Sequence, residues 1–161
     1  MMVLDSTVVV RSVGGSVDGG GGGGGQQPNL GDDYTATDGV TFNSDAGLFD
    51  YHIIGTALND EIYAGSGADL IEGGDGADDI WARGGNDEIP SGTGGGTIRA
   101  GSGNDTIFGS VGGDSIYGDD GDDIVFGGAS GEAIRGGLGT DWLEGGGGDD
   151  WIAFSLGSLI A

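Results

Sequence analysis

The chain of 161 residues contains no cysteine and no lysine, and it has only two prolines and one histidine. Without cysteine there are neither disulfides nor zinc–thiolate sites to hold a fold together, which suits either an exported or a cytosolic protein. Glycine is abundant instead, with 42 residues, so the chain cannot build an ordinary mixed core. Something other than core burial must stabilise the folded state.

Positive charge is scarce, because only four arginines face 27 acidic residues and the net charge is −23. This excess of like charge opposes compaction. Nucleic acid is excluded as an expected partner, since its phosphates would be repelled and no basic patch exists to release their counterions. The charge predicts metal cations as partners and a folded state that needs them.

The residues that enzymes most often use are also missing. His52 is the only histidine, and no HExxH-type zinc motif is present, so neither a catalytic triad nor a metalloprotease centre is expected. We interpret His52 as a surface or capping residue. No enzymatic activity and no catalytic residue are predicted.

The N-terminal segment has no basic leader, and its apolar runs at residues 1–4 and 8–10 are short. Neither a cleavable signal peptide nor a membrane span is therefore expected. Export by a Sec-type route is disfavoured.

A nine-residue repeat begins at Gly55. Its large apolar residues recur at an unchanged interval of nine positions: Ile62, Ile71, Ile80, Ile89, Ile98, Ile107, Ile116, Val125, Ile134, Leu143 and Ile152. Ten of these eleven units carry an acidic residue two positions earlier: Asp60, Asp69, Asp78, Asp87, Asp105, Asp114, Asp123, Glu132, Asp141 and Asp150. Gly96 takes that place in the remaining unit, and glycines crowd the four positions before it in most units.

Units such as GGDGADDIW (73–81), AGSGNDTIF (100–108) and GGLGTDWLE (136–144) resemble the pattern G-G-x-G-x-D-x-U-x of RTX (repeats-in-toxin) proteins, in which U is a large apolar residue. The resemblance is specific because the period, glycine, acidic and apolar positions must all agree. It implies a hemolysin-type calcium-binding β-roll with several Ca²⁺ ions. It also implies that the sixth residue of each unit is a side-chain ligand, which makes the ten acidic residues above the candidate metal site.

Elementary physical chemistry predicts the same fold. Three residues around U can form a short strand, and six glycine-rich residues can form the sharp turn that positive φ angles permit. Two units then close one coil, which gives an all-β, right-handed parallel β-roll (a β-solenoid) of about five to six coils. Each buried isoleucine contributes only about 1.5 to 3 kcal/mol, whereas ordering nine residues costs on the order of 10 kcal/mol. Metal ligation must supply much of the rest.

Because two units make a coil, units two apart stack on one edge and bring their acidic residues together. The column on what we call the unbroken edge is Asp69, Asp87, Asp105, Asp123 and Asp141. The column on the interrupted edge is Asp60, Asp78, Gly96, Asp114, Glu132 and Asp150. We predict tighter binding on the unbroken edge, and calcium rather than magnesium, because calcium accepts six to eight oxygens in irregular geometry. About eight ions would reduce the net charge to about −7.

The alternative interpretation is a disordered acidic linker, which composition alone favours. The unbroken apolar phase argues against it when calcium is present. Without calcium, repulsion between stacked carboxylates predicts an unfolded chain. Leu58 and Ser130 replace the fourth glycine of their units, so the ends of the interrupted edge are doubtful sites.

Three regions are expected along the chain. Residues 1–45 form an N-terminal segment with a β-strand and a glycine-rich linker at 19–25; the strand caps the roll, pairs with a neighbouring subunit or belongs to a loose tail. Residues 46–153 form the β-roll, including a decayed first coil in which Ile53 is in phase. Residues 154–161 form an apolar tail that caps the last coil or carries an export signal.

The residues that flank U point outward. On one face Tyr117 is expected to lie between Arg99 and Arg135. The other face presents the apolar residues Leu70, Phe108, Ile124, Phe126 and Trp142. These rows indicate either ordinary cross-strand pairing or a face that packs against a partner, an extracellular polysaccharide or a second copy of the chain.

Two functions are consistent with these features. One is a calcium-binding module that is unfolded at low cytoplasmic calcium and folds outside the cell. The resemblance to RTX proteins implies type I secretion, without a cleaved signal peptide, to the extracellular space or cell surface. The alternative is a structural subunit that assembles into a calcium-stabilised extracellular fibre or surface layer.

Overall fold

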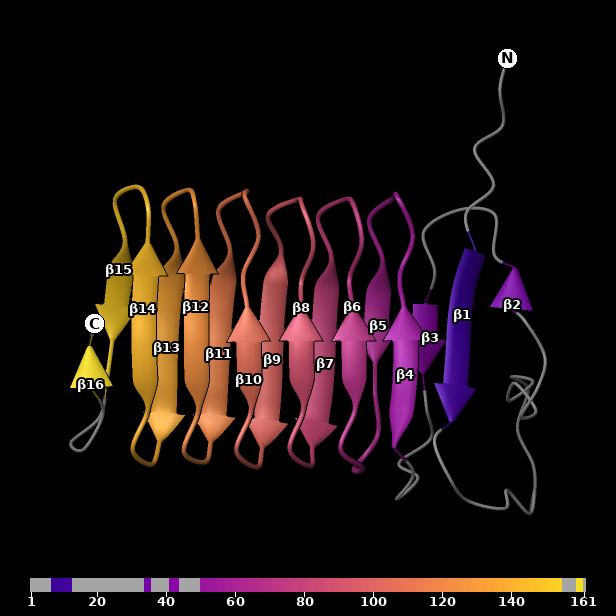
Figure 1. Cartoon of the computed structure of the whole chain (residues 1–161), viewed down its shortest axis with the longest axis horizontal. Coiled ribbons are helices and arrows are strands. Elements are labelled where there is room, and N and C mark those ends of the chain that lie inside the picture. Colours follow the sequence, from indigo (N-terminus) through magenta and orange to yellow (C-terminus); the bar gives the residue numbers. More distant parts are fainter. Residues whose placement is uncertain (1–6, 13–33, 36–40, 44–49, 155–158, 161) are drawn as a thin grey trace.

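The computed structural model describes residues 7–12, 34–35, 41–43, 50–154 and 159–160, and all secondary structure in these residues is β-strand, arranged in two sheets (Figure 1). The nine-stranded sheet contains β1 (Thr7–Ser12), β2 (Tyr34–Thr35), β4 (Tyr51–Ile54), β6 (Leu70–Glu72), β8 (Glu88–Pro90), β10 (Thr106–Phe108), β12 (Ile124–Gly128), β14 (Trp142–Gly146) and β16 (Leu159–Ile160). The seven-stranded sheet contains β3 (Thr41–Asn43), β5 (Glu61–Tyr63), β7 (Asp79–Gly84), β9 (Thr97–Ser102), β11 (Ser115–Asp120), β13 (Ala133–Leu138) and β15 (Trp151–Ala153).

Successive strands of the repeat alternate between the two sheets, so two units complete one coil. Neighbouring strands of the repeat are parallel within each sheet, and Ile107 pairs with Ile89 on one side and Val125 on the other, each eighteen residues away. The coils stack side by side into a β-solenoid of about six turns (Figure 1). This confirms the fold predicted from the nine-residue period.

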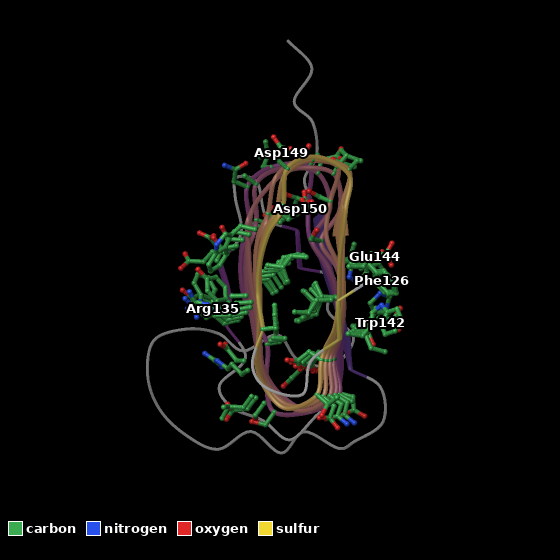
Figure 2. The ribbon with its side chains drawn as sticks, turned by 90° about the vertical axis from the view of Figure 1, so that its left-hand side faces the viewer. Phe126, Arg135, Trp142, Glu144, Asp149 and Asp150 are labelled. Carbon is green, nitrogen blue, oxygen red and sulfur yellow. The ribbon has the colours of Figure 1, made fainter. Side chains whose placement is uncertain are left out.

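The core is a double column of aliphatic side chains between the sheets. The apolar residue of each unit points inward because it occupies the middle of a three-residue strand segment. The fully buried members of these columns are Ile53, Ile62, Ile71, Ile80, Ile89, Ile98, Ile107, Ile116, Val125, Ile134 and Leu143. A view along the stack shows the flattened ring of the coils, with side chains from both sheets inside it and others outside (Figure 2).

The N-terminal end of the nine-stranded sheet is covered by β1. This strand runs antiparallel to β4, with Val10 opposite Ile53, and β2 pairs with its other side. Ile53 itself pairs with Ile71, so the predicted decayed coil keeps the repeat register. The predicted glycine-rich linker at 19–25, and residues 155–158 and 161 of the predicted tail, lie outside the described residues.

The two outer faces carry paired side chains. The ring of Tyr117 lies between Arg99 and Arg135, with guanidinium-to-ring-centre distances of 4.1 Å and 5.7 Å, as the spacing predicted. Phe108 and Phe126 stack on the opposite face with ring centres 5.3 Å apart. Figure 2 shows Phe126 and Trp142 on one side of the ring and Arg135 on the other.

Candidate metal-binding turns

The sixth residue of each unit ends a turn and directly precedes a strand, so the acidic residues form one column along each edge of the solenoid. The structure brings together the two columns that the sequence predicted, eighteen residues from one member to the next. All ten acidic residues except Asp150 are at most 3 % exposed. Asp150, in the last turn, is half-buried and points into the turn, whereas its neighbour Asp149 points outward (Figure 2).

One oxygen of each carboxylate on the unbroken edge belongs to a ladder of hydrogen bonds. The backbone N–H of Asp69 donates to Asp87 Oδ1 over 2.8 Å, and that of Asp87 donates to Asp105 Oδ1 over 2.8 Å. The ladder continues from Asp105 to Asp123 (2.9 Å) and from Asp123 to Asp141 (3.2 Å). Each carboxylate is thereby held in a fixed orientation beside the next turn.

The same ladder is incomplete on the interrupted edge. Asp60 N–H donates to Asp78 Oδ1 over 2.9 Å, and Gly96 N–H donates to Asp114 Oδ1 over 2.8 Å. Gly96 has no side chain to accept a bond from Asp78, so the column of carboxylates is broken there.

The second carboxylate oxygen is buried without a hydrogen-bond partner in five of the turns. These atoms are Oδ2 of Asp78, Asp87, Asp105 and Asp123, together with both carboxylate oxygens of Glu132. A buried, unpaired carboxylate oxygen is costly. A bound cation would remove that cost, so the donor set fits a metal ion.

Burial also disfavours the charged form of these side chains. Loss of hydration, with a smaller contribution from the charge of Asp105, raises the pKa of Asp87 to about 8 and that of Asp123 to about 7. The same loss of hydration raises the pKa of Asp69 and Asp78 to about 6. Either a proton or a metal cation is needed to relieve the charge in this environment.

On the unbroken edge, glycines of one turn pack closely against the backbone carbonyl groups of the turn before it. A Cβ on Gly103 would lie 1.6 Å from the carbonyl oxygen of Gly85, and one on Gly121 would lie 1.7 Å from that of Gly103. Only glycine therefore lets successive turns approach this closely. The turns supply hard oxygen atoms from the backbone beside the carboxylates.

Carboxylates alone do not form a compact site. Within the described part of the chain, no three Asp, Glu or His side chains are close enough together to hold a metal ion. A cation between two turns would therefore need backbone carbonyl oxygens as well as carboxylates, which is the mixed oxygen set that calcium accepts.

A family model of the RTX calcium-binding nonapeptide repeat matches the chain in four copies, over residues 54–89, 99–131 and 126–158. The chain belongs to this RTX repeat family. A β-roll of RTX repeats is a structural calcium-binding fold, and such repeats are typical of secreted proteins. No curated protein and no solved structure matched the sequence. No helix in the described residues could span a membrane.

The family match omits residues 90–98, which include the one unit without an acidic residue. Gly96 stands in its sixth position, and the buried hydroxyl of Ser91 in its first position has no hydrogen-bond partner. This RTX unit keeps the apolar core residue Ile98 and lacks the acidic side chain that the other units carry in the sixth position.

His52 does not contribute to the turns. Its Nε2 atom lies 2.7 Å from Oε1 of Glu72 on the neighbouring strand, partly exposed on the outer face. Sequence reasoning missed two hydroxyl groups that do contact carboxylates: Thr56 Oγ1 donates to Asp60 over 3.0 Å, and Ser110 Oγ donates to Asp114 over 2.9 Å. The available signal was a hydroxyl residue in the second position of a unit, where the RTX pattern has glycine.

Proposed function

We propose that this RTX chain is a calcium-responsive module whose β-roll folds when calcium binds between stacked turns. The proposed side-chain ligands come from the acidic residues of the sixth positions, and turn carbonyls complete the coordination. The observation that carries this proposal is the row of buried carboxylate oxygens without hydrogen-bond partners, best developed at Asp87, Asp105 and Asp123. Calcium would neutralise charges that burial and mutual repulsion otherwise disfavour.

The unbroken edge is proposed to bind calcium more tightly than the interrupted edge. Its hydrogen-bond ladder orients every carboxylate from Asp87 to Asp141. Preorganised ligands lose less freedom when the ion binds. On the interrupted edge Gly96 removes one ligand and Glu132 introduces a longer side chain.

The proposed place of action is outside the cell. Calcium is scarce in cytoplasm and near millimolar outside, so weak sites would be empty during synthesis and filled after export. An RTX chain that stays unfolded until it meets calcium suits a type I secretion route without a cleaved signal peptide. We propose no catalytic role for the chain.

We propose a separate role for each of the three regions of the chain. Residues 46–153 are the calcium-dependent roll, residues 1–45 contribute a strand and a linker at its N-terminal end, and residues 154–161 form a tail or cap.

Calcium titration followed by circular dichroism tests this function. We expect β-structure to appear cooperatively between micromolar and millimolar calcium, with magnesium at the same concentrations as the control giving no comparable change. A spectrum that stays disordered at millimolar calcium would refute the proposal. A folded spectrum that is the same in calcium and in chelator would also refute it.

A second candidate function is self-association into a fibre or surface layer, and the apolar outer face of the nine-stranded sheet favours it. Phe108, Ile124, Phe126 and Trp142 are each between 37 % and 43 % exposed there. Ile124 pairs with Trp142 and Phe108 pairs with Phe126, so the four side chains form one contiguous patch. Exposed patches of this kind pack against partners, which here would be another copy or a polysaccharide.

Sedimentation in millimolar calcium distinguishes another copy of the chain from a polysaccharide as the partner of this patch. If copies associate through the patch, Trp142→Ser combined with Phe126→Ser should reduce particle size, while Tyr63→Ser on the opposite face should not. If the wild-type chain is a monomer, self-association is wrong. Retention of that monomer by a polysaccharide matrix, lost in the double variant, would identify the other occupant.

A further inference from the structure

The turns of the roll fall into two classes according to the backbone at their second residue. In eight turns this residue has a left-handed φ: Gly74 (103°), Arg83 (79°), Gly92 (107°), Gly101 (112°), Asp119 (73°), Gly128 (143°), Gly137 (119°) and Gly146 (92°). We call these turns open. In the remaining three turns, at 55–60, 64–69 and 109–114, the second residue lies outside that region, and we call them closed. Arg83 and Asp119 adopt the left-handed conformation although it is unfavourable for a residue that has a Cβ atom.

In two of the closed turns the second residue binds the carboxylate of the same turn twice. Thr56 donates its N–H to Asp60 Oδ2 over 2.6 Å, and its hydroxyl contacts the same carboxylate. Ser110 donates its N–H to Asp114 Oδ2 over 2.7 Å and its hydroxyl over 2.9 Å. Both carboxylates therefore have donors from within the protein.

The third closed turn uses the backbone alone. Gly65 donates its N–H to Asp69 Oδ2 over 3.1 Å, and the other oxygen of Asp69 accepts the N–H of Tyr51 over 2.7 Å. Both oxygens of this carboxylate are thus hydrogen-bonded without a metal.

In the open turns of Asp78, Asp87, Asp105 and Asp123, Oδ2 of the carboxylate accepts no such internal bond. Every acidic residue with an unpartnered buried oxygen belongs to an open turn, and none belongs to a closed one. Asp87, Asp105 and Asp123 are the clearest cases, because each side chain is at most 2 % exposed and its Oδ2 has no partner. The backbone of the second residue therefore distinguishes three carboxylates with a donor in their own turn from five acidic residues with an unpartnered buried oxygen.

We infer that the closed turns are held by their own hydrogen bonds and do not bind calcium, and that calcium is confined to places where two open turns with carboxylates stack. This inference rests on the proposed calcium-binding function. The turns that meet this condition are 82–87, 100–105, 118–123 and 136–141 on the unbroken edge, and 127–132 and 145–150 on the interrupted edge. Adjacent pairs among them provide about four sites, half the number expected from stacked acidic residues alone.

A consequence concerns the N-terminal coil, in which both turns are closed, at 55–60 and 64–69. The contact of His52 with Glu72 links β4 to β6 at this coil, and β1 pairs with the outer edge of β4. Repeat proteins commonly end in atypical units that cap the stack. The first coil is such a cap, independent of calcium, on which the calcium-dependent coils stack.

Counting bound ions by native mass spectrometry in calcium tests the inference. The wild-type chain should hold about four ions. Asp114→Asn and Asp60→Asn should bind as many ions as the wild type, while the matched changes Asp105→Asn and Asp123→Asn should each lose at least one. Asparagine keeps the size of the side chain and one acceptor oxygen, so the comparison isolates the charge.

Two outcomes would overturn the inference: about eight ions on the wild-type chain, or loss of an ion in Asp114→Asn comparable to the loss in Asp105→Asn. Circular dichroism at saturating calcium verifies that each variant folds. If Asp105→Asn does not fold, the wild-type count and the Asp114→Asn count still decide the question. Absence of any bound calcium would instead overturn the proposed function.

Discussion

The two oxygens of a single carboxylate have different surroundings in this fold. At Asp105, Oδ1 accepts a backbone hydrogen bond from Asp87, whereas Oδ2 is buried without a partner. The hydrogen bond to Oδ1 fixes the orientation of the side chain. The unpartnered Oδ2 is the atom that a cation would contact. The same residue therefore contributes to the stacking of the coils and to the proposed calcium site.

The raised pKa values predict how the metal-free chain responds to pH. The pKa is about 6 for Asp78, about 7 for Asp123 and about 8 for Asp87, all above the ordinary value of 3.8. A carboxyl whose pKa is raised by folding stabilises the folded state when it is protonated, and this stability is lost as pH rises through the folded pKa. In chelator, the β-roll should therefore be more stable at pH 5 than at pH 8.

Circular dichroism in chelator at pH 5, 6, 7 and 8 checks this expectation through the fraction of β-structure, and light scattering verifies solubility near the isoelectric point of about 4.1. Saturating calcium is the control, since calcium binds the deprotonated carboxylates and should remove or reverse the trend. A metal-free chain that becomes more stable as pH rises from 5 to 8 would contradict the account.

The sequence predicted the positions of the carboxylates but not the state of each turn. Spacing alone placed Asp60 and Asp105 in equivalent positions, and in the structure one is bonded by Thr56 while the other has an unpartnered oxygen. Glycine content did not separate the classes either. Gly65 lies in a closed turn and Arg83 in an open one, so residue type alone does not decide the backbone conformation at this position.

At the scale of strands, the nine-residue period predicted every element that keeps the period. It missed β3 and β16, which lie out of phase. Phe42 in β3 pairs with Ile62, twenty residues later, and Ile160 in β16 pairs with Leu143, seventeen residues earlier. A periodic pattern contains no signal for a strand that joins the sheet through a loop of different length.

The covering strand β1 leads to a prediction about assembly. A chain that begins at residue 34 keeps β2 and the repeats but removes β1, and so exposes the backbone of β4 (Tyr51–Ile54). Free strand edges pair with other edges. We expect this truncated chain to form dimers or larger species in calcium at concentrations where the full chain is smaller.

Sedimentation velocity of the two chains at equal concentration measures the difference. The same comparison in chelator is the control, because edge pairing requires a folded coil. Equal sizes for the truncated and full chains in calcium would show that β1 does not protect the edge.

At the scale of the whole molecule, the fold places ten of its 27 acidic residues in two columns along narrow edges, although the net charge is −23. The core between the sheets is a single layer of aliphatic side chains from each sheet, which contributes about 1.5 to 3 kcal/mol per residue. Such a core does not offset the ordering of glycine-rich turns together with the repulsion between stacked carboxylates. Binding energy from calcium is the remaining source of stability, so folding and metal binding should form one coupled equilibrium.

The most direct test of this coupling is amide hydrogen exchange of the strands between residues 79 and 146, measured by mass spectrometry in millimolar calcium and in chelator. The account predicts slow exchange throughout these strands in calcium, and exchange at least about tenfold faster in chelator near neutral pH. Equal protection in both conditions would show that the roll is stable without the metal. Equal lack of protection would show that calcium does not fold it.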